Sequence, residues 1–557
     1  MFRNFNQFAN RICVIDPQGR HFSYTEIMAS GRAALADLAP AKQLLFIEGR
    51  NTPGFVSAYC AALDAGHLVH VFDPDRAQSI QPLIESYSPD ALVLTDGEVA
   101  RLAPVPRNPE PLLIEDDLAL LLATSGTTGS RKLVKITEGN IAANTAAIIS
   151  YLGMTGEDRG ITTLKPYYSY GLTVINTHLT AGASLVLSNA SVQDSIFWAQ
   201  ATQHGITNFA GVPHSYELLK RMDSRLAALD RLRFATQAGG RLAPDLVRHF
   251  ARLARQGGWR FFVMYGQTEA SPRISYLPPE QAEQFPDAIG LPIPGGRMWL
   301  TDDMGHVITD DGVEGELNYA GPNVMAGYCQ SAIDLGSGDR PASLRTGDMA
   351  RRLPNGLYVL AGRKSRFVKP FGRRLNLDDI EAMLASEGIE AAAMASGETL
   401  MLFVAGDGAT EIALAERLAQ HTRLPASVFD VRPIERIPRL GNDKIDRMAL
   451  QRAIEAVHGT PPAAAQSPSA VLRAVWREFS AIMMGHSGMA TSVADIFRAT
   501  FRHAEVNKTQ SFVSLGGDSM SAVTVHLQLE DLIGTLPPDW HERSIAELEL
   551  MKGSALG

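Results

Sequence analysis

The sequence predicts an α/β protein built from several parts, and three patterns along its 557 residues lead to that prediction. From about residue 40 to 270, short β-rich runs such as LLFIEG and LVHVF alternate with longer segments of helical period, which is typical of layered α/β folds. From about 295 to 360 the pattern changes to short strands separated by Gly, Pro and Asp turns. At 458–468 a Pro- and Ala-rich stretch precedes a short, mainly helical C-terminal part.

The elements can be justified in chain order. In the layered part, one amphipathic helix is predicted over 243–257, with Pro244 near its start and Gly257 at its end. Its apolar residues form a single stripe that should cover a sheet: Leu246, Val247, Phe250, Leu253 and Ala254. The turns DDMGH, DDGVEG and LPNGL predict hairpins in the β-rich distal part. Beyond Gly362, the helical stretch LDDIEAMLASEG and the strand-like LMLFVAG predict a smaller α+β unit that ends near residue 458.

Composition excludes several classes of function. The formal net charge of −9 gives no general attraction to nucleic acid or to anionic lipid, so neither is an expected partner. No stretch offers 18 uninterrupted apolar residues, and the N-terminus lacks the apolar core of a signal peptide. The cysteines Cys13, Cys60 and Cys329 are too far apart for a disulfide framework or a cysteine zinc cluster. These observations favour a cytoplasmic protein.

A phosphate-binding loop is predicted where the apolar run ALLL enters a segment rich in hydroxyls and glycine. Glycines let backbone N–H groups converge on an anion, the hydroxyls donate further hydrogen bonds, and a lysine supplies positive charge. The residues concerned are Thr124, Ser125, Gly126, Thr127, Thr128, Gly129 and Lys132. Their spacing does not match the Walker loop, and a polar turn between strand and helix is the alternative for this run taken alone.

Four further segments follow in a fixed order: YGQTEA at 265–270, LRTGD at 344–348, GRKSRFVKPFGRRL at 362–375 and GNDKIDR at 441–447. Together with the loop they resemble the acyl-adenylate-forming (ANL) superfamily, which includes acyl-CoA synthetases, luciferases and the adenylation domains of peptide synthetases. The resemblance covers about residues 10–455. It implies an ATP- and Mg²⁺-dependent ligase that joins a carboxylic acid to AMP and then passes the acyl group to a thiol.

The resemblance also implies a role for each matching residue. In the nucleotide site, Tyr265 would stack on adenine beside Gly266, and Gly239 and Gly240 would line the other face of the base. Asp348 would accept both ribose hydroxyls, with Arg363 close to the same sugar. At the phosphates, Thr268 would contact the α-phosphate and Glu269 would hold Mg²⁺. Lys444 would bridge the acyl carboxylate and the α-phosphate as the catalytic lysine. Ser365 stands where the family usually has a hinge Asp or Lys, so the hinge chemistry is altered.

The C-terminal part carries the sequence Gly-Gly-Asp-Ser at 516–519, which should present Ser519 at the start of a helix. A simple N-cap serine is the alternative. The segment resembles acyl- and peptidyl-carrier domains, helical bundles whose serine receives 4′-phosphopantetheine from a phosphopantetheinyl transferase. The expected domains are therefore a large adenylation domain (1–361), a mobile adenylation subdomain (362–457), a linker (458–468) and a carrier domain (469–557).

The nature of the acid is suggested by LKPYYSYGL. In amino-acid-activating relatives, an aspartate in the similar segment pairs with the substrate's ammonium group, and Tyr168 occupies that place here. With Gly171 in the same segment and Tyr167 and Tyr170 beside it, the pocket wall is aromatic and uncharged. A small or medium-sized non-amino carboxylic acid is expected. A carboxylate from another loop would reverse this expectation.

Two other patterns are set aside. GHSGM at 485–489 lacks the second glycine of a nucleophile elbow, and His67 and His70 have no carboxylate cluster near them, so a metal site is not expected. Two rival functions stay open. One is an acid:CoA ligase with a secondary carrier-like tail. The other is a carrier protein, serving an unknown downstream acceptor enzyme, whose adenylation activity has decayed.

Overall fold

The structure is a computed structural model that divides into two compact units. The first unit comprises Met1–Phe367 with Gly441–Asp443, and the second comprises Val368–Leu440 with Lys444–Gly557. The described residues are 5–103, 105, 112–123, 132–336, 338, 340–368, 375–396, 399–405, 411–422, 424–439, 445–451, 492–500, 506–515, 525–526, 529, 532–533, 536–537 and 539–551. The bounds of the four expected segments stay predictions.

One sheet of the first unit has seven strands within the described residues, in the order β19-β8-β7-β4-β3-β5-β6. Its central strands are parallel and their side chains are buried on both faces, which explains why the sequence shows continuous apolar runs here. The strands are β3 (Leu44–Glu48), β4 (Leu68–Phe72), β5 (Ala91–Asp96), β6 (Val99–Ala103), β7 (Leu118–Ala123), β8 (Leu133–Thr137) and β19 (Tyr328–Cys329).

A second sheet has fourteen strands in the same described part, in the order β17-β16-β18-β20-β21-β15-β14-β13-β12-β11-β9-β10-β1-β2. Strands β9 to β13 form its parallel region, and β13 to β21 are paired antiparallel. The strands are β1 (Ile12–Ile15), β2 (His21–Ser23), β9 (Arg159–Ile161), β10 (Ser184–Val186), β11 (Asn208–Gly211), β12 (Phe234–Gln237), β13 (Arg260–Tyr265), β14 (Ser275–Leu277), β15 (Ala288–Pro292), β16 (Arg297–Thr301), β17 (Val307–Ile308), β18 (Glu314–Ala320), β20 (Leu344–Arg352) and β21 (Tyr358–Arg363).

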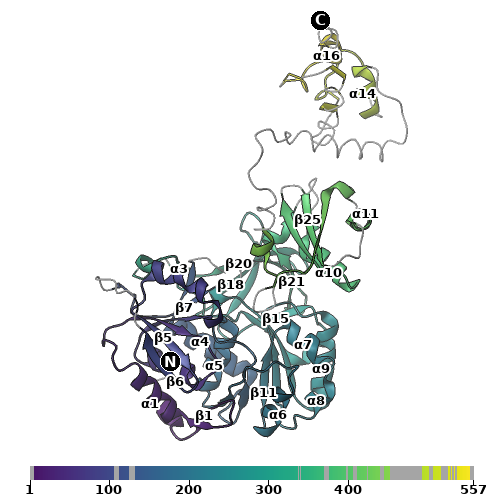
Figure 1. Cartoon of the computed structure of the whole chain (residues 1–557). Coiled ribbons are helices and arrows are strands. Elements are labelled where there is room, and N and C mark those ends of the chain that lie inside the picture. The colour runs from purple at the N-terminus through teal and green to yellow at the C-terminus, as the bar shows by residue number, and fades with distance from the viewer. Residues whose placement is uncertain are drawn as a thin grey trace. The chain divides into compact units, whose positions relative to one another are not determined.

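Helices cover both faces of the parallel region (Figure 1). Because side chains alternate along a strand, Phe262 and Met264 of β13 pack toward α4 and α5, whereas Phe261 and Val263 pack toward α6 to α9. The helices of this unit are α1 (Tyr24–Ala34), α2 (Pro53–Asp64), α3 (Ala77–Tyr87), α4 (Glu138–Leu152), α5 (Ser169–Thr180), α6 (Ser195–Gln203), α7 (Pro213–Leu219), α8 (Asp223–Ala227) and α9 (Pro244–Gly257).

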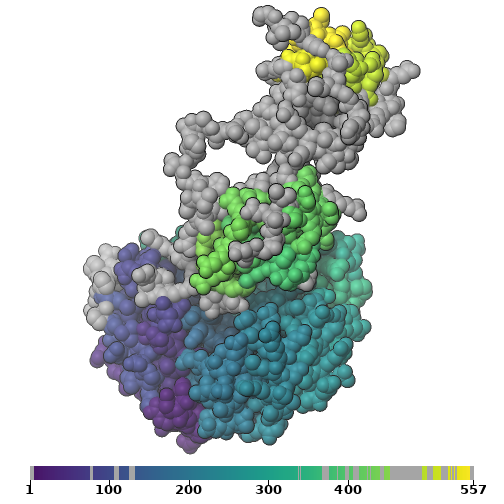
Figure 2. Space-filling model, turned by 45° about the vertical axis from the view of Figure 1, so that its right-hand side comes forward, coloured from purple at the N-terminus to yellow at the C-terminus, as the bar shows by residue number. Residues whose placement is uncertain are grey.

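Helices α4 and α5 also join the two sheets into one body. Ile141 of α4 and Ile175 of α5 belong to the same hydrophobic cluster as Leu120 of β7 and Ile136 of β8. The purple N-terminal and the blue to teal central parts of this unit are in direct contact in Figure 2. The order of layers is therefore seven-stranded sheet, helices α4 and α5, fourteen-stranded sheet, and helices α6 to α9.

Local sequence sets the ends of these helices. Thr137 caps α4 by accepting the Asn140 N–H at 3.0 Å, and Gly153 ends it with a left-handed φ of 62°. The predicted helix over 243–257 is α9, which starts at Pro244 and is capped by Gly258 with φ 72°. The turns DDMGH and LPNGL form the predicted hairpins β16–β17 and β20–β21. The turn DDGVEG leads from β17 to β18, and these two strands pair with opposite edges of β16 instead of with each other.

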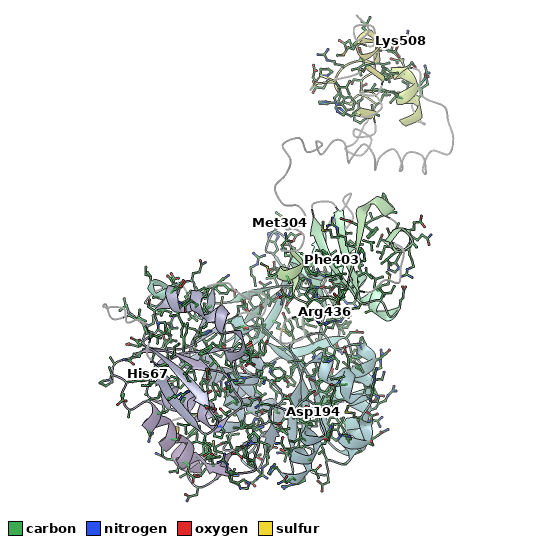
Figure 3. All side chains as sticks on the ribbon, in the orientation of Figure 1. His67, Asp194, Met304, Phe403, Arg436 and Lys508 are labelled. Atoms are coloured by element: carbon green, nitrogen blue, oxygen red, sulfur yellow. The ribbon has the colours of Figure 1, made fainter. Side chains whose placement is uncertain are left out.

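The second unit contains a three-stranded sheet, with β24 antiparallel and β26 parallel to β25. Its described elements are β22 (Phe367–Val368), β23 (Leu375–Asn376), α10 (Leu377–Ser386), β24 (Ala391–Ser396), β25 (Thr399–Ala405), α11 (Glu411–Thr422) and β26 (Phe429–Ile434), followed by α14 (Val493–Thr500) and α16 (Ile545–Met551). Phe403 of β25, labelled in Figure 3, packs with Ile437 and Leu450. The predicted helical-bundle carrier extends beyond the described residues and stays a prediction.

Candidate active site

The candidate site begins at the carboxyl edge of the parallel strands β12 and β13. Gln237 pairs with Val263, so Gly239 and Tyr265, each two residues further on, lie at the same level of that edge. Gly239 is exposed and has a φ of +88°, a backbone conformation that favours glycine. The Gln237 amide donates to the Gly240 carbonyl at 2.9 Å and closes the turn. The two glycines and the tyrosine predicted to enclose adenine therefore come from neighbouring strand ends.

A buried carboxylate, Asp348, links Tyr265 to the antiparallel region. The Tyr265 hydroxyl donates to Asp348 Oδ2 at 2.5 Å, and Arg363 Nε lies 2.9 Å from Oδ1. The pairing of β20 with β21 places Asp348 directly opposite Arg363. Burial, together with the charge of Asp348, raises the pKa of the Tyr265 hydroxyl, so this hydroxyl stays a donor. Three of the predicted nucleotide residues thus form one connected cluster.

Directly after Tyr265 the chain folds back on itself. A Cβ on Gly266 would lie 1.8 Å from the Pro272 carbonyl oxygen, so a larger residue does not fit there. Thr268 and Glu269 follow in a short 3-10 helix, Thr268–Ala270. The buried Thr268 hydroxyl is 3.3 Å from the Ser169 hydroxyl at the start of α5. This bond connects the predicted phosphate contact with the segment predicted to bind the acid.

Glu269 and Lys132, the predicted magnesium and phosphate residues, meet at one tyrosine. The Tyr328 hydroxyl donates to Glu269 Oε1 at 2.9 Å, and Lys132 Nζ lies 3.5 Å from the centre of the Tyr328 ring. Strand β19 pairs with β8 through Tyr328 and Val134, which brings the tyrosine beside Lys132. Burial and the Glu269 charge raise the pKa of Tyr328, which keeps its hydroxyl protonated. The sequence pattern gave no role to Tyr328.

The segment predicted to form the acid pocket begins α5. Tyr168 is the N-cap residue of this helix, with its ring 4.7 Å from that of Tyr167. A Cβ on Gly171 would lie 2.2 Å from the Lys165 carbonyl oxygen, which explains the glycine by close packing. Tyr170 points into the interior, where its hydroxyl is 2.8 Å from that of Thr236. The structure therefore places Tyr170, rather than Tyr168 or Gly171, in the wall of an internal cavity.

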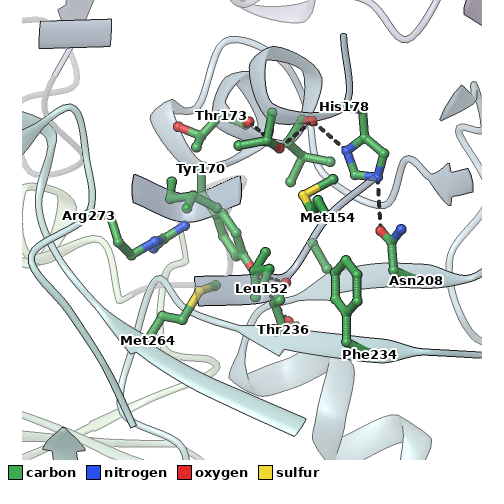
Figure 4. A pocket seen from close by; sticks show the side chains of 14 residues that line it. Leu152, Met154, Tyr170, Thr173, His178, Asn208, Phe234, Thr236, Met264 and Arg273 are labelled. Carbon is green, nitrogen blue, oxygen red and sulfur yellow. Dashed lines mark hydrogen bonds between the residues drawn. The ribbon is translucent and has the colours of Figure 1, made fainter. Parts of the chain in front are cut away.

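That cavity has a volume of about 20 Å³ and lies between α4, α5 and strands β11 to β13 (Figure 4). Its wall combines apolar side chains with threonines, His178 and one arginine. Burial lowers the pKa of His178, so its imidazole is neutral at pH 7. Arg273 approaches Tyr170, with its guanidinium carbon 4.8 Å from the ring centre. Arg273 had no role in the sequence analysis, because only the structure brings it to this cavity.

Several predicted residues cannot be placed. The loop residues Thr124, Ser125, Gly126, Thr127, Thr128 and Gly129, the catalytic candidate Lys444 and the attachment candidate Ser519 lie outside the described residues. Ser365 belongs to a 3-10 turn, Lys364–Arg366, in which Lys364 Nζ is 3.1 Å from Glu316 Oε2. Its predicted hinge role stays a prediction.

The two histidines set aside earlier have structural partners. His67, labelled in Figure 3, accepts the Gln43 N–H at Nδ1, and His70 Nδ1 lies 2.9 Å from the Leu121 carbonyl oxygen. Burial lowers the pKa of His70 to about 4. In the described part of the chain, His, Cys, Asp and Glu side chains form no group of three suited to a metal ion. The same part contains no helix with the length and apolarity needed to cross a bilayer.

Comparison with known families identifies the part of the chain that holds most of this site. Residues 62–329 match the AMP-binding enzyme family. We call this matched part of the chain the AMP-binding domain. The AMP-binding domain includes Tyr265, Thr268, Glu269 and Tyr328, and it ends before Asp348.

Known relatives of the AMP-binding domain include ligases of two kinds. The chain is 29% identical over 358 residues to the L-proline–[L-prolyl-carrier protein] ligase of Pseudomonas fluorescens, covering 61% of this chain and 69% of that one. It is 30% identical over 357 residues to the indoleacetate–CoA ligase of Aromatoleum aromaticum, covering 63% of this chain and 65% of that one. The prediction of an acyl-AMP-forming ligase is confirmed at the level of this domain.

A longer match reaches the C-terminal part. The chain is 24% identical over 560 aligned positions to the non-ribosomal peptide synthetase CmlP of Streptomyces venezuelae, covering 93% of this chain and 54% of that protein. Other relatives are matched over as little as 6% of their length. Among solved structures, the O-succinylbenzoate coenzyme A synthetase of Bacillus subtilis, in complex with ATP and magnesium ion, has a TM-score of 0.65 at 20% identity. That match covers 80% of this chain and 98% of the synthetase, and it establishes the mixed α/β fold.

Proposed function

We propose that the protein uses ATP to activate a carboxylic acid as acyl-AMP and then loads the acyl group onto phosphopantetheine attached to Ser519 of its own C-terminal part. The observation that carries the proposal is the cluster of Tyr265, Asp348 and Arg363 at the sheet edge. Thr268 and Glu269 follow Tyr265 in the short 3-10 helix after β13. In this proposal the aromatic ring would receive adenine, the carboxylate would accept the ribose hydroxyls and the Thr268 hydroxyl would donate to a phosphate.

The residues at the phosphate end fit Mg²⁺. This ion prefers oxygen ligands and is usually held by one or two carboxylates together with substrate phosphates. Glu269 supplies such a carboxylate, steadied by the Tyr328 hydroxyl. Bound Mg²⁺ would neutralise the charge of the phosphates. Lys132, held over the Tyr328 ring, places a second positive charge on the same side of the site.

The first step forms a mixed anhydride. A carboxylate oxygen of the acid attacks the α-phosphorus of ATP, and the bond to the β-phosphate oxygen breaks, so pyrophosphate leaves. Thr268 would donate to an α-phosphate oxygen, and Lys444 would bring its charge to the point where carboxylate and phosphate approach. In the second step the pantetheine thiol loses its proton to solvent and its sulfur bonds to the acyl carbon. The bond from that carbon to the phosphate oxygen breaks, so AMP leaves.

Loading onto the protein's own carrier is supported by two likenesses. The alignment with the peptide synthetase CmlP covers 93% of this chain, so it extends into the C-terminal part beyond the predicted linker. The ligase from Pseudomonas fluorescens is named for transfer to a carrier protein. A phosphopantetheinyl transferase would be required as a partner, and an enzyme that accepts the thioester would act afterwards.

A non-amino acid is the proposed substrate. An α-ammonium group needs an opposing charge when it is buried. The start of α5 offers Tyr168 and the hydroxyls of Ser169 and Tyr170, and none of them carries a negative charge. Pyrophosphate exchange into ATP, measured for a panel of α-amino acids and a panel of unsubstituted acids, tests this step. A higher kcat/KM for any α-amino acid would overturn it.

Intact-mass analysis tests the complete proposal. After treatment with a phosphopantetheinyl transferase and CoA, the protein should gain one arm, and ATP with the correct acid should then add the acyl mass. Ser519→Ala should prevent both additions and leave pyrophosphate exchange unchanged. An arm on another residue, or no arm on the parent, would rule out the carrier.

An acid:CoA ligase is the second candidate, favoured by the likeness to indoleacetate–CoA ligase. The full-length Ser519→Ala variant distinguishes the two functions. If free CoA is the acceptor, this variant forms acyl-CoA at the parent rate. If the carrier is the acceptor, the variant forms acyl-AMP and acyl-CoA production stays at background. A protein with decayed adenylation activity would give no exchange with any acid.

A further inference from the structure

Arg273 is a buried cation in the wall of the internal cavity beside α5. Arg273 is only 3% exposed, and its Nε atom has no hydrogen-bond partner in the part of the chain that the structure describes. The residue lies five positions after Thr268, so one short segment supplies both the phosphate contact and this guanidinium. The Arg273 backbone is held firmly, because its carbonyl accepts from Asn144 at 3.3 Å and from Asn323 at 2.8 Å.

The absence of an opposing charge sets Arg273 apart from other buried charges. Five other Asp, Glu or Lys side chains are buried among the described residues, and each forms an ion pair. The pairs are Asp16–Arg20, Lys135–Glu115, Asp158–Arg233, Glu316–Arg345 and Asp348–Arg363. No described carboxylate lies within ion-pair distance of Arg273. A buried charge without an opposing charge is costly, so such groups are normally paired.

The partners that Arg273 does have are neutral aromatic groups. Its guanidinium carbon is 4.8 Å from the centre of the Tyr170 ring. Burial raises the pKa of the nearby Tyr151 hydroxyl, and the positive charge of Arg273 offsets part of that rise. The Tyr151 hydroxyl points toward Met264 Sδ at 2.9 Å. These contacts orient the guanidinium and leave its charge uncompensated.

The cavity beside Arg273 is the space that an anionic group would enter. Figure 4 shows the arginine directed toward Tyr170 and the cavity, with Thr173 and Thr236 on the surrounding elements. At about 20 Å³ it can hold roughly one water-sized group, which suits the end of a short acid. Tyr170 is adjacent to Ser169, whose hydroxyl contacts Thr268. One residue of the cavity wall, Tyr170, is therefore the direct sequence neighbour of a residue that contacts the predicted phosphate-binding threonine.

We propose that the acid substrate is a short dicarboxylic acid whose second carboxylate pairs with Arg273. This inference rests on the proposed acyl-AMP-forming function and specifies its substrate class. One carboxylate reacts at the phosphate end, and the other occupies the cavity and compensates the guanidinium charge. The fork of N–H donors on arginine matches a carboxylate in geometry as well as charge. The same positive charge repels an ammonium group, which agrees with a non-amino acid.

The test compares matched pairs of acids with the full-length protein. Pyrophosphate exchange into ATP is measured for succinate against butyrate, and for glutarate against pentanoate, so that chain length is constant within each pair. We expect the parent to favour the dicarboxylate in at least one pair by about 100-fold in kcat/KM. Arg273→Met should remove that preference, and KM for ATP should stay within about twofold of the parent value.

A matched control separates recognition from general packing. Arg260 also stacks on an aromatic ring, with its guanidinium carbon 5.3 Å from the Phe262 centre, but it donates to the Leu152 carbonyl and does not line the cavity. Arg260→Met should keep the dicarboxylate preference. If Arg273→Met fails to fold, as judged by circular dichroism, Arg273→Lys tests the same point. It keeps the charge without the fork, and we expect a reduced preference of the same sign.

The outcomes distinguish this inference from the proposed function. Exchange with monocarboxylates at least equal to that with the matched dicarboxylates overturns the role of Arg273 and leaves acyl-AMP formation intact. The role of Arg273 is also overturned if Arg273→Met lowers kcat/KM by the same factor for both acids of a pair. That result would indicate a structural role only. Exchange with no acid from either panel overturns both statements.

Discussion

At the scale of single residues, the site depends on groups that hold other groups in place. Asp348 accepts the Tyr265 hydroxyl on one carboxylate oxygen and pairs with Arg363 through the other, so both neighbours hold this carboxylate in place. Tyr328 has a similar positioning role at the predicted phosphate end, where it contacts both Glu269 and Lys132. Positioning of this kind matters because catalysis by preorganised charge loses strength when charged groups can move.

Tyr328→Phe should weaken the response to Mg²⁺. The substitution removes the hydroxyl that donates to Glu269 and keeps the ring beneath Lys132. We expect kcat to fall about tenfold and the Mg²⁺ concentration for half-maximal rate to rise, since one hydrogen bond to a charged group contributes about 1.5–3 kcal/mol. Steady-state pyrophosphate release across a Mg²⁺ titration measures both.

The control for this variant is Tyr24→Phe, which removes a buried hydroxyl that donates to the Ala183 carbonyl at 2.7 Å. It should lower thermal stability without moving the Mg²⁺ midpoint. A Tyr328→Phe enzyme with the parent's Mg²⁺ midpoint would show that the hydroxyl does not position Glu269.

What the sequence could reveal at this scale was residue type and order. YGQTEA and LRTGD identified Tyr265, Glu269 and Asp348 because their neighbours in sequence form recognisable patterns. Arg273 and Tyr328 have no such surroundings. The importance of Arg273 comes from a missing partner, and that of Tyr328 from a pairing with β8 almost 200 positions away, and neither property is local.

At the scale of elements, the surrounding structure explains one glycine and one histidine. The fold-back after β13 exists because Gly266 lets the chain approach the Pro272 carbonyl. In β4, His70 is enclosed by neighbouring strands and contacts Phe46, with ring centres 4.8 Å apart. Gly266 therefore affects stability through the fold-back after β13, and His70 affects it through its burial in β4.

Gly266→Ala should lose both stability and ATP binding, because the added Cβ would lie 1.8 Å from backbone oxygen. We expect a fall in the free energy of unfolding of about 2 kcal/mol or more, with a higher KM for ATP. Gly139→Ala in α4 is the matched control. Its Cβ would meet only the Thr137 hydroxyl at 3.6 Å, and alanine is the better helix former, so stability should stay equal or rise. Equal melting temperatures for the two variants would contradict this account.

His70 should make the first unit less stable as the pH falls. Burial lowers its pKa in the folded state from 6.5 to about 4. Between these values the unfolded chain binds a proton that the folded protein does not, so stability decreases as pH is lowered from about 6.5 to 4. The loss amounts to about 3 kcal/mol in total at 1.36 kcal/mol per pH unit.

The His70→Gln variant isolates this contribution, because it keeps a donor for the Leu121 carbonyl and cannot titrate. The free energy of unfolding is measured with denaturant at pH 7 and pH 5. Its difference between the two pH values should be smaller in the variant than in the parent, by the contribution of one titrating histidine. An unchanged difference between the two pH values would assign the effect to other groups.

Element positions were predictable where the pattern was local. Pro244, the apolar stripe and a C-terminal glycine were enough to delimit α9, and Gly-containing turns were enough to indicate the hairpins. The continuation of those hairpins into the fourteen-stranded sheet was not predicted. It depends on β15 pairing with β21 through Ala288 and Val359, and strand partners so far apart leave no mark in local composition.

At the scale of the whole molecule, the proposal requires two parts of one chain to react with each other. Lys444→Ala should abolish acyl-AMP formation and leave the fold intact, because it removes the charge predicted to act where carboxylate and α-phosphate approach. Ser519→Ala should retain acyl-AMP formation and lose loading. An equimolar mixture of the two variants, both treated with phosphopantetheinyl transferase, then allows loading only between molecules.

Tethering makes a clear kinetic prediction for these proteins. Loading of the parent should have the same rate constant after tenfold dilution, because the linker keeps the local concentration of the arm constant, in about the millimolar range. In the mixture, the observed rate constant of loading should fall about tenfold on the same dilution, because loading there occurs between molecules. Radiolabelled acid retained on precipitated protein measures both. Dilution-sensitive loading in the parent would indicate transfer between separate molecules.

The pairing of β8 with β19 has a consequence during synthesis. Lys132 and Tyr328 come together only when the chain between them has been made, and Asp348 meets Arg363 later still. Domains generally fold as the N-terminal part emerges from the ribosome. A nascent chain that ends between residues 329 and 363 contains all seven strands of the first sheet but lacks a complete nucleotide site. ATP can therefore stabilise this protein only late in translation, and truncated products gain no protection from it.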